Sequence, residues 1–128
     1  MRLLLDTHAL IWWMQESPSL SRPARNAIVS PASKISVSAA SAWEIATKLR
    51  LGKLRVSMQI VEHFGEYLDS AGFASLPVSA EHGIRAGLLP GDHKDPFDRM
   101  LIAQAQAENL AILSNEAVFD HYGVRRIW

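Results

Sequence analysis

The amino-acid sequence predicts an α/β domain with a central parallel sheet of about five short strands flanked by helices. Short apolar segments alternate along the chain with longer segments of helical periodicity. We interpret these short segments as apolar rather than alternating, which is typical of strands that are covered on both faces. The chain has 128 residues, a length that suits one domain spanning residues 1–128.

Each expected element follows from periodicity and from its flanking residues. In chain order they are a strand at Arg2–Leu5, helices at Ala9–Gln15 and Arg22–Val29, a strand at Lys34–Ser38, helices at Ser41–Leu51 and Gln59–Ser70, a strand at Phe73–Leu76, helices at Ser79–Leu88 and Pro96–Asn109, a strand at Ala111–Leu113, a short helix at Asn115–Tyr122 and a strand at Val124–Ile127. Ser21 is a natural N-cap, with Pro23 in the first turn of its helix. Gly52 is a natural helix end.

The composition is globular, with 48% apolar and 20% charged residues. The absence of cysteine excludes disulfides and thiolate metal sites, and it is compatible with the cytoplasm, where we expect the protein to act. Asp6 and His8 interrupt the apolar N-terminus, and no segment approaches the roughly 18 apolar residues of a membrane span. The net charge of +0 argues against an extensively basic nucleic-acid-binding surface but allows a local basic patch.

Acidic residues gather at one predicted edge of the sheet. Asp6 follows the first strand, Glu44 lies on the helix after the second, and Asp98 lies in the first turn of the helix before "AIL". Glu116 comes just after that strand. Ligands of open parallel sheets bind beyond the carboxyl ends of the strands. Converging carboxylates repel one another, and a hard divalent cation, Mg²⁺ or Mn²⁺, relieves that repulsion.

Three of these acids, and Asp95 beside them, also have an interpretation in terms of helix stability. Asp6, Asp95 and Glu116 each stand near a predicted helix start, where an acid can act as an N-cap. Asp95 fits this role best because Pro96 follows it at the first helical position. Asp98 would then interact favourably with the helix dipole, an effect of roughly 0.3–1 kcal/mol.

Glu44 is harder to explain in this way because it stands among small and apolar residues. Its alternative interpretation is an ion pair with Lys48, four residues later on the same helix. The five histidines do not indicate zinc, because no HExxH motif or suitably spaced pair occurs. We expect His8 and His93 to lie near the site as surface or hydrogen-bonding side chains.

Three segments, "LLLDTHALIWW", "SAASAWEIATKLRLGKL" and "DPFDRMLIAQAQAENLAILSNEAVFDHYGVRRIW", resemble the PIN-domain nucleases, especially the VapC-type toxins of bacterial toxin–antitoxin pairs. The resemblance covers nearly the whole chain. It implies a divalent-metal-dependent endoribonuclease whose acids are Asp6, Glu44 and Asp98. A fourth acid, typically aspartate in the family, corresponds to Glu116 here.

The resemblance also implies how substrate and partners are bound. The hydroxyls of Thr7 and Ser114 correspond to residues near the substrate phosphate, and Arg50, Lys53 and Arg55 are candidates for gripping the RNA backbone. The implied cofactor is Mg²⁺ or Mn²⁺, which would activate a water for in-line attack on the phosphodiester. The implied protein partners are a cognate antitoxin and a second copy of the chain. An exposed tryptophan among Trp12 and Trp13 would suit such an interface.

Other functions fit the residues less well. A haloacid-dehalogenase-type phosphatase needs an acid two residues after Asp6, where His8 stands, and a phospho-receiver domain needs an acidic pair near the first strand. The alternative that stays open is a non-catalytic PIN-fold module that binds RNA or protein and has a weakened metal site. The glutamate at position 116 is the feature that favours it.

Overall fold

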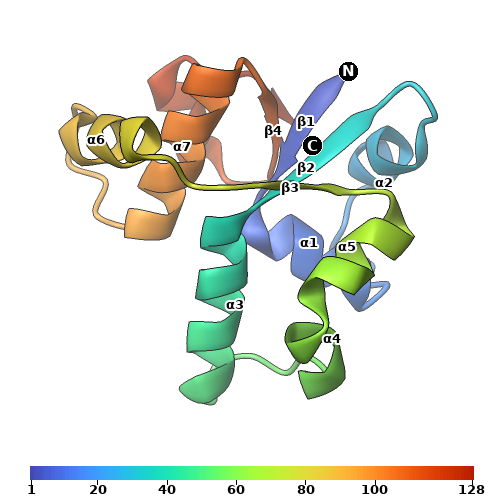
Figure 1. Cartoon of the computed structure of the whole chain (residues 1–128). Coiled ribbons are helices and arrows are strands. Elements are labelled where there is room, and N and C mark those ends of the chain that lie inside the picture. The colour runs from blue at the N-terminus through green and yellow to red at the C-terminus, as the bar shows by residue number, and fades with distance from the viewer.

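A five-stranded, wholly parallel sheet forms the centre of the protein in a computed structural model that describes residues 1–128 (Figure 1). The strands lie in the order β3-β2-β1-β4-β5. Their bounds are Arg2–Leu5 for β1, Lys34–Ser38 for β2, Ala74–Leu76 for β3, Ala111–Leu113 for β4 and Arg126–Ile127 for β5. The prediction of an α/β fold with five short parallel strands is confirmed.

Helices cover both faces of this sheet. They are α1 (Thr7–Met14), α2 (Arg22–Val29), α3 (Ala39–Arg50), α4 (Met58–Glu62), α5 (Phe64–Ala71), α6 (Ala80–Leu88), α7 (Pro96–Glu108) and a 3₁₀ turn, η1, at Ala117–Tyr122. Figure 1 shows α6 and α7 on one side and α1, α2 and α5 on the other, while α3 and α4 extend beyond the carboxyl ends of the strands. No helix is long and apolar enough to cross a membrane.

The central strands β1 and β4 are apolar at every buried position because each face of the sheet packs against its own core, whereas β2, KISVS, alternates polar and apolar residues. Leu3 and Leu5 of β1 belong to the larger cluster, with residues of α1, α2 and α5. Leu4 points the other way into a second cluster, with Leu101 and Ile102 of α7. All three leucines are fully buried. Successive strand residues point to opposite faces, so a strand covered on both sides needs an apolar residue at every position.

The predicted helix caps of α2 and α7 are confirmed. The Ser21 hydroxyl accepts a hydrogen bond from the Ala24 amide, and Pro23 lies in the first turn of α2. One carboxylate oxygen of Asp95 accepts from the amides of Phe97 and Asp98, with Pro96 at the first helical position of α7. The capping interpretation of Asp95 is therefore correct.

Several predicted boundaries were wrong. The single helix expected at Gln59–Ser70 is two helices, α4 and α5, because His63 leaves the helical region at φ −119° and ψ 40°. Gly65, in the first turn of α5, has a low helix propensity that weakens continuity there. The expected helix at Asn115–Tyr122 is the shorter 3₁₀ turn η1. The last strand, expected at Val124–Ile127, covers only Arg126–Ile127.

The chain order of the strands creates a topological switch point. From the central strand β1 the chain moves outward through β2 to β3, and it then returns to the other side of β1 to form β4 and β5. The connections that leave β1 and β4 therefore diverge. A crevice forms beyond the carboxyl ends of two such strands, and this is where open parallel sheets bind ligands. Asp6 directly follows β1, and Ser114 directly follows β4.

Candidate active site

Asp6 lies at this switch point with only 2% of its surface exposed. Its amide donates to the Leu113 carbonyl at 3.1 Å, and the Ser114 hydroxyl donates to its Oδ2 at 2.7 Å. The side chain makes no capping hydrogen bond to α1, so the N-cap interpretation of Asp6 is wrong. Burial raises the pKa of Asp6 to about 6, against the lowering effect of the Ser114 hydrogen bond, and repulsion from Glu116 and Glu44 adds to the rise.

Asp98 lies in the first turn of α7, where the Asp95 cap holds the backbone. Its side chain is mostly buried, and its Oδ2 lies 2.9 Å from Nε2 of His93. Burial raises the pKa of Asp98 to about 7, and repulsion from Asp95, Asp6 and Glu116 adds to this, while the His93 hydrogen bond lowers it. The expected hydrogen-bonding role of His93 is confirmed.

Glu44 projects from the middle of α3 and is 3% exposed. Its Oε2 contacts Nζ of Lys48, so the alternative interpretation of Glu44 as part of an ion pair is correct. Burial alone would lower the pKa of Lys48, but the hydrogen bond and charge of Glu44, with Asp95 and Asp98 beyond it, raise the pKa overall. Lys48 contacts Oε2 of Glu44 and leaves Oε1 unengaged by this ion pair.

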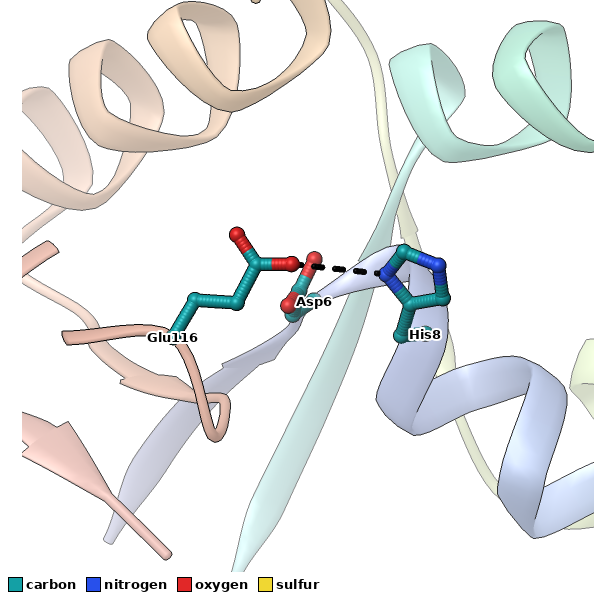
Figure 2. A group of neighbouring side chains, drawn as sticks. All are labelled: Asp6, His8 and Glu116. Carbon is teal, nitrogen blue, oxygen red and sulfur yellow. Dashed lines mark ion pairs between the residues drawn. The ribbon is translucent and has the colours of Figure 1, made fainter. Parts of the chain in front are cut away.

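Glu116 stands at the start of η1 but makes no capping hydrogen bond, so the capping interpretation expected for it is wrong. Its Oε1 instead lies 3.6 Å from Nδ1 of His8 on α1. Figure 2 shows the two side chains reaching toward each other beside Asp6. Asp6, His8 and Glu116 each offer one ligand atom, and these atoms all lie within 4.8 Å of one another.

His8 was expected near the site only as a surface or hydrogen-bonding side chain, and not as a possible metal ligand. The available signal was its position two residues after Asp6, at the first turn of the helix that begins beyond β1. Glu44 and Asp98 stand outside the group in the present arrangement. The contacts that hold them are those to Lys48 and His93.

The four acids nevertheless share one electrostatic field. They come from four separate parts of the chain: the end of β1, the middle of α3, the start of α7 and the segment after β4. Repulsion from Glu44 and Glu116 acts on Asp6, and repulsion from Asp6 and Glu116 acts on Asp98. Carboxylate oxygens at this density, with one imidazole at the rim, are a donor set that fits a hard divalent cation such as Mg²⁺ or Mn²⁺.

The two hydroxyls expected near the substrate are engaged within the protein. The Thr7 hydroxyl donates to Oγ of Ser41 at 2.9 Å. The Ser114 hydroxyl donates to Asp6 and accepts from the Glu116 amide at 3.0 Å. Both residues are almost fully buried. Their visible role is therefore to hold the acidic loops in place.

The basic residues expected to grip RNA are exposed, but they lie away from the acids. Arg50 ends α3, about 9 Å along the helix from Glu44, and Lys53 and Arg55 follow in the next loop. Arg99, although adjacent to Asp98, donates to three backbone carbonyls, those of Ala86, Leu89 and His93. It thus fixes the loop before α7 and is not free to bind phosphate.

The expected exposed tryptophan is also found elsewhere. Trp12 and Trp13 are half-buried against the larger core, where Trp12 lies 5.8 Å from Trp128 between ring centroids. The exposed tryptophan is Trp43 on α3, with 63% of its surface accessible. Its ring meets that of Phe97 edge-on, 4.8 Å between centroids.

A family model described as "PIN domain" matches residues 3–124. The chain belongs to the PIN-domain family. PIN domains are generally nucleases, and the acidic cluster lies where the topology of this PIN domain places a ligand site. A search of curated proteins found no match.

Solved structures of toxin–antitoxin proteins share the fold. A chain of VapBC2 from Rickettsia felis, in a structure bound to a DNA fragment from its promoter, superposes with a TM-score of 0.67 at 16% identity, covering 98% of this chain and 97% of that one. A chain of VapBC-1 from nontypeable Haemophilus influenzae gives 0.66 at 14% identity, covering 98% and 96%. FitAcB from Neisseria gonorrhoeae gives 0.57 at 18%, covering 97% and 95%.

Proposed function

We propose that this PIN domain is a divalent-metal-dependent endoribonuclease and the toxin of a VapBC-type toxin–antitoxin pair. The observation that carries the proposal is the burial of Asp6, Glu44 and Asp98 at the switch point of the sheet. Burying mutually repelling carboxylates is costly. Helix capping does not explain Asp6, and the ion pair with Lys48 engages only one oxygen of Glu44. A site that binds a cation accounts for both.

Asp6, Asp98 and Glu44 would hold Mg²⁺ or Mn²⁺, with Glu116 and His8 at the rim. When bound, the ion would supply a water of lowered pKa and would offset negative charge on the phosphodiester. The protein's part is to orient the ligands. Ser114 engages Oδ2 of Asp6 and His93 engages Oδ2 of Asp98, and these contacts leave the second oxygen of each carboxylate for the cation.

We propose RNA as the substrate, with Arg50, Lys53 and Arg55 binding its backbone away from the point of cleavage. These side chains are exposed on the part of α3 and its following loop that extends beyond the sheet (Figure 1). Their removal should weaken binding more than it slows the cleavage step.

We also propose a cognate antitoxin and a homodimer as the assembly. An apolar groove of ≈ 360 Å³ lies beside Trp43 and is lined by Val78, Phe97 and Met100 among others. The groove lies on α3 and α7, the helices that carry Glu44 and Asp98. None of the four acids lines this groove, so a partner could bind there without contacting them directly. The structural neighbours from VapBC complexes support an antitoxin as the partner.

The decisive experiment is cleavage of single-stranded RNA by the purified chain with Mg²⁺ or Mn²⁺, and with EDTA in place of the metal. We expect cleavage only with metal, and we expect Asp6→Asn and Asp98→Asn to abolish it. Asp69→Asn is a matched control because Asp69 is an exposed acid on α5. RNA binding without metal-dependent cleavage would instead favour the non-catalytic module.

A further inference from the structure

Lys48 is placed differently from the other basic residues of the chain. It lies one helical turn after Glu44 on α3, and its ammonium contacts Oε2 of that buried carboxylate. The Glu44 side chain is 5% exposed, whereas that of Lys48 is 32% exposed. Lys48 therefore stands between a buried acid and the solvent, at the mouth of the acidic cluster.

The surrounding charges draw Lys48 toward the cluster. Glu44 attracts its ammonium directly, and Asp95 and Asp98 attract it from α7. Arg99 does not pair with these acids, since its guanidinium donates to backbone carbonyls. Among Lys and Arg residues, Lys48 alone pairs with one of the four acids of the candidate site, so it is the group best placed to offset their charge.

An ammonium carries three donors, and Glu44 engages only some of them. Lysine also has a long, flexible stem, so its charged end can shift by several ångströms without moving the helix. A divalent cation at the carboxylates would reduce their attraction for Lys48. An RNA phosphate arriving at the same place would offer the ammonium a new anionic acceptor.

We propose that Lys48 is a catalytic residue that occupies Glu44 in the metal-free protein and donates from Nζ to a non-bridging oxygen of the scissile phosphate when metal and RNA are bound. This inference rests on the proposed ribonuclease function and adds a phosphate-binding group to it. The contact with phosphate would stabilise the charge that develops there during hydrolysis.

The proposal makes two predictions of opposite sign. In the metal-free protein Lys48 competes with the cation for Glu44, so its removal should tighten metal binding. In the reaction Lys48 stabilises the phosphate, so its removal should slow cleavage. An ion pair that served only to stabilise α3 would give no specific loss of turnover in a variant that is folded.

The test uses Lys48→Met, which keeps the length of the side chain without its charge, and Lys48→Arg as the conservative variant. Lys34→Met is the matched control, because Lys34 is exposed and begins β2, at the end of the sheet opposite to the acids. Mn²⁺ affinity is measured by titration calorimetry without RNA, and kcat and KM are measured on single-stranded RNA. Circular dichroism confirms that each variant is folded.

We expect Lys48→Met to bind Mn²⁺ at least about 3-fold more tightly than wild type, because a nearby positive charge has been removed. We expect its kcat to fall on the order of 100-fold, as for the loss of one transition-state donor, with a smaller change in KM. Lys48→Arg should recover part of kcat, and Lys34→Met should leave Mn²⁺ affinity and kcat unchanged.

Unchanged or weaker Mn²⁺ binding by Lys48→Met would overturn the competition for Glu44. A wild-type kcat in that variant would overturn the catalytic role. These results differ from a failure of the proposed function, in which the wild-type chain itself cleaves no RNA with metal. In that case the catalytic role of Lys48 is refuted together with the proposed ribonuclease function. The Mn²⁺ titration still tests whether Lys48 competes with the cation for Glu44.

Discussion

Asp6→Asn should make the metal-free protein more stable at pH 8, although it removes a residue from the centre of the fold. Asp6 is almost fully buried, and burial together with Glu116 and Glu44 raises its pKa from 3.8 to about 6. Asparagine has nearly the same shape, carries no charge and can still accept the hydrogen bond from Ser114. The substitution therefore removes the cost of a buried charge and keeps the contact.

The sign of the effect follows from proton binding. Between pH 3.8 and about 6 the folded protein holds a proton on Asp6 that the unfolded chain has released, so the stability of the wild type falls as the pH rises through this window. At about 1.4 kcal/mol for each tenfold change in proton affinity, this rise in pKa corresponds to about 3 kcal/mol lost above pH 6. Asp6→Asn avoids that loss.

The assay is thermal unfolding followed by circular dichroism in EDTA between pH 4 and pH 8. We expect Asp6→Asn to exceed the wild-type Tm by roughly 10 °C at pH 8 and to match it near pH 4. Added Mg²⁺ should raise the Tm of the wild type and have little effect on the variant. Asp69→Asn should show neither effect. A lower Tm for Asp6→Asn at pH 8, or a difference independent of pH, would refute the reasoning.

Three further predictions concern neighbouring contacts. Ser114→Ala removes the donor to Asp6, so it should raise the pKa of Asp6 further and weaken Mn²⁺ binding in calorimetry, whereas unchanged binding would contradict a positioning role. Asp95→Ala should lower the free energy of unfolding by about 0.5–2 kcal/mol through loss of the α7 cap, as read from urea titration, and a neutral result would mean that the cap is dispensable. Trp43→Ser should weaken capture of the co-expressed antitoxin without lowering the Tm, since Trp43 is exposed; undiminished capture would place the antitoxin elsewhere.

Much of the fold followed from local patterns. The bounds of β1, β2 and β4 were predicted correctly because such short segments between turn residues are too short to form a helix. The caps at Ser21 and Asp95 were also readable, since a cap depends on residues within one turn. The break at His63 was missed because α4 has no buried residues, so the sequence there gives no clear pattern of helix packing, and helix propensity alone is a weak guide.

The acids of the candidate site were found for a topological reason. Parallel strands end at a common edge, so Asp6 and Glu116 could be brought together without knowing any side-chain position. Their contacts could not be predicted in the same way. Glu116 could have capped a helix and instead reaches His8, and Arg99, although adjacent to Asp98, donates to backbone carbonyls.

From residue order alone, one can infer which segments become strands and helices and which acids arrive at the same edge of the sheet, because both depend on short-range periodicity and chain direction. Which oxygen Asp6 keeps free depended on folding, because Ser114 engages its Oδ2 across 108 residues. The pair of Glu44 and Lys48 lies within one helix and could be anticipated from its spacing. The contact of Ser114 with Asp6 depends on a distance of 2.7 Å between side chains from separate elements, and only the packing of β1 beside β4 sets that distance.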